Sequence, residues 1–156
     1  MKILRHPLKL KKMKLGIGLT IWAVFALAAC NQDDERVQET EDEVMAIHDE
    51  VMPKMQDIMN LKKQLSAELV ELDSLQQEGV SSTTLAEQKM KALEISQDLG
   101  MADSLMMDWM YQYRGDSAKA LPAADALVYF RLEKDKMLDV QKRTNQSLEA
   151  ARAFLK

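Results

Sequence analysis

The sequence predicts an all-α protein, an antiparallel up-down-up bundle of three long helices that follows an N-terminal signal peptide. Strong helix formers (Leu, Ala, Met, Glu, Lys and Gln) are abundant, whereas aromatic residues make up only 5% of the chain. Apolar residues recur with helical spacing in three long stretches. Turns that contain glycine separate these stretches from one another.

The first 29 residues have the composition of a bacterial signal peptide. Six basic residues and no acidic one lie within the first 14 positions, and an apolar run over residues 15–26 follows them. This run has the length of the apolar region of a signal peptide and is shorter than a typical membrane span. An uncleaved N-terminal transmembrane anchor is the alternative. We therefore exclude residues 1–29 from the prediction of the fold.

The only cysteine of the chain ends this apolar run, in the order Leu27-Ala28-Ala29-Cys30. The motif resembles the lipobox of bacterial lipoproteins, in which signal peptidase II cuts before the cysteine. The resemblance implies that the thiol of Cys30 carries a diacylglycerol and that its new amino group is acylated, for example with palmitate. Each buried methylene contributes about 0.8 kcal/mol, so two or three acyl chains would hold the protein on a membrane without a spanning helix.

Residues 30–39 are predicted to form the lipidated cysteine and a flexible acidic tether, because they are polar and lack apolar periodicity. The order Gln32-Asp33-Asp34-Glu35 resembles the acidic export signal of surface lipoproteins in Bacteroidota. Asn31 differs from the aspartate that retains enterobacterial lipoproteins in the inner membrane. We expect anchoring in the outer membrane of the cell envelope. Whether the protein faces the periplasm or the cell surface stays open.

The first helix should cover about residues 40–78. Thr40 and Glu43 form a capping box, in which each side chain can bind a free backbone N–H group of the first turn. Apolar residues then recur at spacings of three and four as far as Gly79, which favours a helix end. Pro53 removes one backbone donor, so we expect a kink there, with a complete break as the alternative.

The second helix should cover about residues 84–114. Thr84 and Glu87 form another capping box, and Gly115 follows the last apolar position. The predicted inward-facing seam repeats with a period near 3.5 residues. It consists of Leu85, Gln88, Ala92, Ile95, Leu99, Ala102, Met106, Trp109 and Tyr113.

The third helix should cover about residues 122–155, since Pro122 suits the first turn of a helix. Its inward-facing stripe is the most polar of the three. This stripe consists of Ala126, Phe130, Met137, Val140, Thr144, Leu148, Ala151 and Leu155. Short connections between helices of similar length favour antiparallel neighbours, so residues 40–156 should form one bundle. An extended coiled-coil oligomer is the alternative, and the oligomeric state stays open.

Removal of the signal peptide leaves a strongly acidic chain. The whole chain has 21 Lys and Arg residues against 25 Asp and Glu residues, a net charge of −4. Because six of the basic residues precede Cys30, 15 remain against 25 acidic ones, and the net charge becomes −10. This balance argues against nucleic-acid binding, which requires Lys and Arg beside phosphates. With Cys30 lipidated, no thiol is left for a disulfide or a cysteine metal site.

The sequence predicts a protein that is not an enzyme. His48 is the only histidine after the signal peptide, and no glycine-rich phosphate loop or Ser/His/Asp pattern occurs. We therefore expect a scaffold or interaction module that contacts the membrane through lipidated Cys30 and binds a protein partner in the envelope. The sequence itself requires no cofactor. A carrier of an apolar ligand and a metal-binding protein are the alternatives.

A line of methionines is the basis of the metal-binding alternative. Met45, His48, Met52, Met55 and Met59 follow one another at spacings of three and four, so they share one side of the first helix. Thioether and imidazole groups select Cu(I), which an envelope protein without thiols would have to bind in this way. An antiparallel hairpin would add methionines from the second helix. The predicted ligands are His48, Met52, Met55, Met107 and Met110.

Two other interpretations of these methionines stay open. Methionine fills irregular gaps in a core and packs well against aromatic rings, so the line can belong to the bundle core. Methionine-rich surfaces also adapt to different apolar partners, so the line can border a groove for an apolar ligand or a partner helix.

The segment Met45–Met55, which contains His48 and Pro53, and the segment Met106–Met110 also carry a wider resemblance. They are similar to small helical lipoproteins of Bacteroidota that have the automatic label "viral A-type inclusion protein". The resemblance implies a helical fold and a lipid anchor. It implies no viral function, no particular activity and no site residues.

Overall fold

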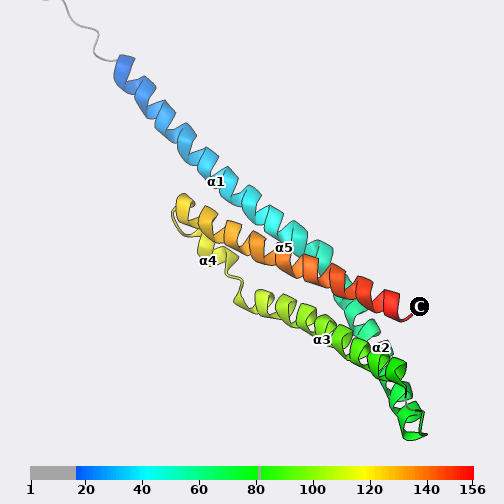
Figure 1. Cartoon of the computed structure of the whole chain (residues 1–156). Helices are drawn as coiled ribbons and strands as arrows, with labels where there is room; N and C mark the ends of the chain where they lie inside the picture. The colour runs from blue at the N-terminus through cyan, green and yellow to red at the C-terminus, as the bar shows by residue number, and fades with distance from the viewer. Residues whose placement is uncertain (1–16, 81) are drawn as a thin grey trace, which may run out of the picture.

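The computed structural model describes residues 17–80 and 82–156, with side chains from residue 32 onward. All regular structure in this part is helical, which confirms the predicted all-α class. In Figure 1, α1 and α5 lie side by side, while α3 runs back along α2 and α5. The helices are α1 (Ile17–Val51), α2 (Lys54–Gln77), α3 (Thr83–Gln112), α4 (Gly115–Lys119) and α5 (Ala123–Phe154).

The core follows a strict seven-residue repeat along α1 and α2. A side chain at every seventh position from residue 37 to residue 72 is buried. These side chains are Val37, Val44, Val51, Ile58, Leu65 and Leu72. Such a repeat keeps one narrow apolar seam against neighbouring helices, as in coiled coils. The long-range packing of the chain is organised around this seam.

The predicted single helix over residues 40–78 is two helices in the structure. α1 ends at Val51 and α2 begins at Lys54, so the helix is interrupted at Pro53 and not merely kinked. The N–H of Met52 still bonds to the carbonyl of His48 (2.8 Å), whereas the N–H of Met55 bonds to the carbonyl of Met52 (3.1 Å). Because proline has no N–H and clashes with the preceding turn, the regular ladder stops here. The break lets α1 pack on α5 while α2 packs mainly on α3.

Residues 32–39 belong to α1 and do not form the predicted flexible tether. The side chain of Val37 is only 7% exposed and packs in a cluster with Ala118, Ala126, Leu127 and Phe130. One valine among polar residues is a weak periodic signal, but it lies seven positions before Val44. Residues 1–16 of the predicted signal peptide lie outside the described residues, as does the side chain of Cys30.

Helices α1 and α5 run parallel in a fixed register. Two polar pairs join them, and a third joins Lys54, the first residue of α2, to α5; the two members of each pair are separated by 91 residues. The pairs are Lys54–Asn145 (2.9 Å), Lys134–Glu43 (2.7 Å) and Gln141–Glu50 (2.8 Å). A constant separation requires that both helices advance in the same direction.

Helix α3 reverses the direction of the chain after a turn at Gly79. Gly79 has a φ of 86°, a left-handed conformation that glycine adopts without steric cost. The hydroxyl of Ser82, not that of Thr84, caps α3 by accepting from the N–H of Leu85 (3.1 Å). Ion pairs then join α2 and α3 in antiparallel order. They are Lys89–Asp73 and Lys62–Asp103 (3.6 Å).

The predicted third helix agrees with α5 to within about one residue at each end. Its buried face is indeed polar, since it includes Glu133, Thr144 and Ser147. The short helix α4 lies in the segment that the sequence predicted as a plain connection. Among the described residues, no helix has both the length and the apolar character needed to cross a membrane.

We expect Thr144→Val to stabilise the protein by about 1 kcal/mol, because an unpaired buried hydroxyl costs that order of free energy. The hydroxyl of Thr144 is fully buried and has no hydrogen-bond partner in the structure. Valine has the same shape without the polar atom. Urea unfolding followed by circular dichroism measures the change. The exposed Thr84→Val is the matched control, with an expected effect within about 0.5 kcal/mol. A loss of stability in Thr144→Val would contradict the absence of a hydrogen bond to the Thr144 hydroxyl.

Candidate functional site

The structure divides the predicted metal ligands between two surroundings. Met52 and Met55 pack against a buried cluster. This cluster consists of Val44, Val51, Met106, Trp109, Met137 and Val140. Met107 and Met110 lie instead on the exposed surface of α3, with exposed fractions of 57% and 42%. The methionine that α3 contributes to the core is Met106, which lies seven positions after Leu99 on the same seam.

His48 lies at the edge of this buried cluster. Its side chain is 17% exposed, and its Nδ1 atom lies 2.9 Å from Oδ1 of Asp49. The centre of its ring lies 5.5 Å from the ring of Trp109. A carboxylate on one ring nitrogen orients the imidazole and leaves the other nitrogen available, as in many metal-binding histidines. Packing on an indole also suits a histidine without a ligand. Among the described residues, no group of three or more His, Asp or Glu side chains converges as a metal site.

A ladder of aromatic rings connects the three longest helices at this end of the protein. The steps are His48–Trp109 (5.5 Å), Trp109–Tyr113 (4.8 Å), Tyr113–Tyr129 (6.3 Å) and Tyr129–Phe130 (5.3 Å). These centroid distances lie in the range of favourable aromatic contacts. The sequence had placed Trp109 and Tyr113 on the inward seam of the second helix, and the structure agrees. The ladder is therefore part of the packing between helices.

A buried carboxylate anchors the short helix α4 to α1. Glu41 occupies the apolar seam of α1 and is 8% exposed. Lys119 lies 3.0 Å from one of its oxygens, and the hydroxyl of Tyr113 donates to the other (3.3 Å). Gly115 allows this approach, because a Cβ there would lie 2.7 Å from the Tyr113 hydroxyl and 2.9 Å from Glu41. The contact stabilises the connection between α3 and α5.

The pKa values in this region move away from neutrality. Burial, followed by the charge and hydrogen bond of Glu41, raises the pKa of Tyr113 far above its ordinary value. Burial also raises the pKa of Tyr129, although its hydroxyl accepts from the N–H of Arg114 (2.6 Å). The hydrogen bond with Glu41 raises the pKa of Lys119. These three groups therefore stay protonated at neutral pH, unlike a general base, whose pKa lies near the working pH.

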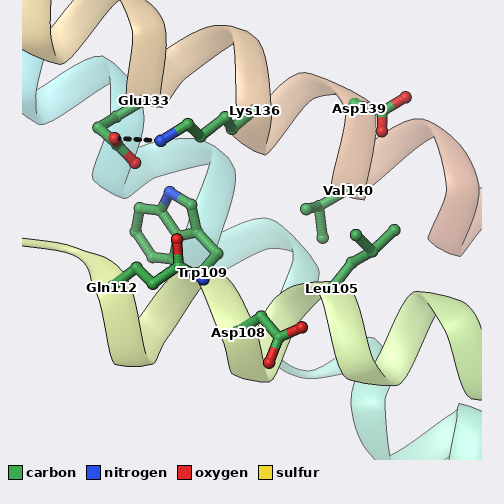
Figure 2. A pocket seen from close by; sticks show the side chains of 8 residues that line it. All are labelled: Leu105, Asp108, Trp109, Gln112, Glu133, Lys136, Asp139 and Val140. Atoms are coloured by element: carbon green, nitrogen blue, oxygen red, sulfur yellow. Dashed lines mark hydrogen bonds and ion pairs between the residues drawn. The ribbon is translucent and has the colours of Figure 1, made fainter.

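A groove of about 250 Å³ opens between α3 and α5, and we call it the α3/α5 groove (Figure 2). It is lined by Leu105, Asp108, Trp109, Gln112, Glu133, Lys136, Asp139 and Val140. Lys136 lies 2.7 Å from a carboxylate oxygen of Glu133, as the dashed line in Figure 2 marks. The Nε1 atom of Trp109 is buried and has no hydrogen-bond partner in the structure. Lys136 pairs with Glu133 and Arg143 pairs with Asp139 (2.8 Å), so Asp108 is the carboxylate of this lining that makes no ion pair within the described part of the chain, which favours a positively charged group beside it.

Helix α3 also carries exposed apolar side chains on the face opposite its buried seam. We call these five side chains the outer stripe, and their exposed fractions range from 43% to 81%. They are Met90, Leu93, Met101, Met107 and Tyr111. The buried residues of α3 follow the same heptad period on the other side of the helix. The sequence-based prediction missed this stripe, because Gln97 and Ser104 interrupt it and the inward seam is the stronger periodic signal.

Neither a family model, nor a curated protein, nor a solved structure matches this chain. The lipobox and the similarity to small helical lipoproteins therefore stay predictions from sequence. The functional interpretation rests on the outer stripe, the α3/α5 groove and the cluster around His48.

We expect Tyr113→Phe to make the folded state less sensitive to alkaline pH. The pKa of Tyr113 is higher in the folded chain than in the unfolded chain, so the unfolded chain loses this proton first. The free energy of unfolding therefore falls as the pH rises above about 10. Phenylalanine has no phenol to ionise, so this contribution to the fall is absent in Tyr113→Phe. At pH 7 the substitution removes only the hydrogen bond to Glu41, worth about 1 kcal/mol.

Urea unfolding at pH 7 and pH 11 measures this effect. Tyr111→Phe is the matched control, because Tyr111 lies on α3 close to Tyr113 but is 81% exposed. The control should lose as much stability at pH 11 as the unsubstituted protein. An equal alkaline loss in Tyr113→Phe would contradict the role of the buried phenol.

Proposed function

We propose that this protein is a lipid-anchored interaction module of the cell envelope, without enzymatic activity. Acyl chains on Cys30 hold it at the membrane, with the outer membrane as the expected site. Its helical part presents the outer stripe of α3 to a protein partner. The exposure of this stripe, on a helix whose opposite face is fully used in the core, is the observation that carries the proposal.

The helical part forms, in this proposal, an up-down-up bundle of three arms. α1 and α2 together are the first arm, α3 is the second and α5 is the third. The parallel register of α1 and α5 and the antiparallel ion pairs of α2 and α3 support this arrangement. Each arm then buries its seam inside the bundle. Apolar side chains that remain on the outside of α3 therefore serve no purpose in folding.

The energetics favour burial of the outer stripe by a partner. Complete burial of a large apolar side chain contributes about 1.5–3 kcal/mol relative to full exposure. Met101 and Met107 are each more than half exposed, so most of this contribution is unused in the isolated chain. Exposed apolar side chains that gather on one face of a domain often mark an interaction site. Methionine is well suited to such a site, because its flexible side chain adapts to the partner.

Charge and anchoring support a partner other than the lipid surface. The chain after residue 29 has a net charge of −10, so its surface is repelled by anionic lipid. α1 continues as a helix from Ile17 to Val51, which joins Cys30 to the bundle without a flexible segment. Anchoring would therefore hold the bundle upright beside the membrane, with α3 accessible from the side.

A photo-crosslinking amino acid at position 101 or 107 tests the proposal in intact cells. We expect a discrete adduct with an envelope protein at both positions, because both side chains lie in the outer stripe. Position 70 is the matched control, since Val70 of α2 is 64% exposed but lies outside the stripe. Gel analysis of affinity-purified protein measures the adducts. Adducts of equal yield at position 70, or none at positions 101 and 107, would contradict the proposal.

Cys30→Ala provides the second arm of this experiment. The variant should lose incorporation of labelled palmitate and should lose the adducts at position 101, because the anchor brings α3 to its partner. Retention of the palmitate label would contradict lipidation at Cys30.

Cu(I) binding is a second candidate function, favoured by the contact between His48 and Asp49 beside Met52 and Met55. Competition with a coloured Cu(I) chelator measures the affinity of the purified protein. We expect His48→Ala combined with Met52→Ala to weaken binding at least about tenfold, or about 1.4 kcal/mol. Met59→Ala is the matched control, because Met59 is 60% exposed. No binding, or equal affinity in the double variant, would contradict this candidate. A carrier of apolar ligands has less support, since three carboxylates line the α3/α5 groove.

A further inference from the structure

We infer that the partner of the outer stripe is a basic amphipathic helix. This inference rests on the proposed function and adds the chemistry of the partner. The apolar side of the partner helix covers Met101, Met107 and Tyr111. Its Lys or Arg side chains meet the acidic residues that flank the stripe, and one of them enters the α3/α5 groove.

The charge of α3 is the first reason for this choice. From Ala92 to Gln112 the helix contains four acidic residues and no Lys or Arg. Two of them are already compensated, because Glu94 pairs with Lys91 (2.8 Å) and Asp103 pairs with Lys62 (3.6 Å). The other two are Asp98 and Asp108, and neither makes an ion pair within the described part of the chain. A partner with positive charge would therefore complement this face.

The position of the unpaired carboxylates is the second reason. Asp108 lines the α3/α5 groove from α3, across from Glu133 and Asp139 of α5, which are already paired with Lys136 and Arg143. Asp98 and Arg143 line a second opening of about 260 Å³ between the same two helices, beside Met101, and Arg143 is already paired with Asp139 (2.8 Å). Each opening thus lies along the same flank of the outer stripe. The alkyl stem of a Lys or Arg side chain can pack on Leu105 and Val140 while its charged end reaches the carboxylates.

The length of the stripe fits a helix. Met90 and Tyr111 are 21 residues apart, which corresponds to about 31 Å along α3. A partner helix of about 20 residues would cover this distance. Its apolar residues would pack along the stripe in the manner of a coiled-coil seam, with the basic residues at the edge.

A second copy of this chain is the less favourable occupant. Antiparallel pairing of two α3 helices around Met101 would place Glu94 opposite Asp108 at both ends of the contact. Parallel pairing would place each carboxylate opposite its own copy. Like charges that face one another across a helix interface disfavour association, so the acidic flank argues against self-pairing.

Three synthetic helical peptides of 20 residues test the inference. The first has a leucine face and a lysine face, the second has glutamate in place of lysine, and the third keeps the lysines but has serine in place of leucine. The full chain is held in nanodiscs of zwitterionic lipid, with empty nanodiscs as the blank. Fluorescence anisotropy measures the dissociation constants at two salt concentrations.

We expect the leucine–lysine peptide to bind at least about tenfold more tightly than either of the other peptides, and more weakly as the salt concentration rises. Met101→Glu combined with Met107→Glu should weaken its binding at least about tenfold. Asp108→Asn should weaken its binding and reduce the salt dependence. Val70→Glu and Met59→Glu on α2 are the matched controls, and they should leave the affinity unchanged.

Equal binding of the lysine and glutamate peptides would overturn the inference. An equal loss in the α2 control variants would also overturn it, because binding would then be independent of the outer stripe. The photo-crosslinking experiment does not depend on these peptides. Adducts at positions 101 and 107 without preference for the lysine peptide would leave the proposed function in place and remove only the chemistry assigned to the partner.

Discussion

The heptad seam of the first two helices is the constraint on which the rest of the structure depends. Val37, Val44 and Val51 of α1 and Ile58, Leu65 and Leu72 of α2 keep one phase across the break at Pro53. Because the phase survives the break, one apolar stripe packs first on α5 and then on α3. The parallel register of α1 and α5 follows from this packing, as do the positions of the aromatic ladder and of α4.

Polar residues within the seam determine the details of the packing at one end of the protein. Glu41 and His48 occupy positions on α1 where a simple heptad would have apolar side chains. Each has a specific partner, Lys119 for Glu41 and Asp49 for His48, so the cost of burying a polar group is offset. The same contacts tie α4 and Trp109 to α1. These contacts make the region a junction between α1, α3 and α4.

The outer face of α3 exposes apolar side chains that its own packing leaves unburied, as α5 also does at Val128, Leu132 and Leu138. The inner face of α3 is used completely, whereas its outer stripe exposes methionine and tyrosine side chains beside uncompensated carboxylates. A basic amphipathic helix would bury the exposed apolar side chains of α3 and would also pair with its unpaired acidic residues. The methionines of α3 thus divide into Met106, which packs in the core, and Met101 and Met107, which are available for contact.

The sequence by itself determined the all-α class, the third helix and the inward seam of α3 apart from Gln88, which is exposed, because each depends on local composition or on spacing along one helix. Only the tertiary structure decided whether Pro53 kinks or breaks the first helix, since neighbouring helices determine which direction of α2 buries the most apolar surface. The assignment of residues 32–39 to α1 also required the tertiary structure. A single valine in a polar segment does not predict a helix, and the burial of Val37 is seen only once α4 and α5 cover it. The heptad spacing had already placed Met106 on the inward seam and left Met107 off it, whereas the exposure of Met107 on the outer surface is seen in the structure.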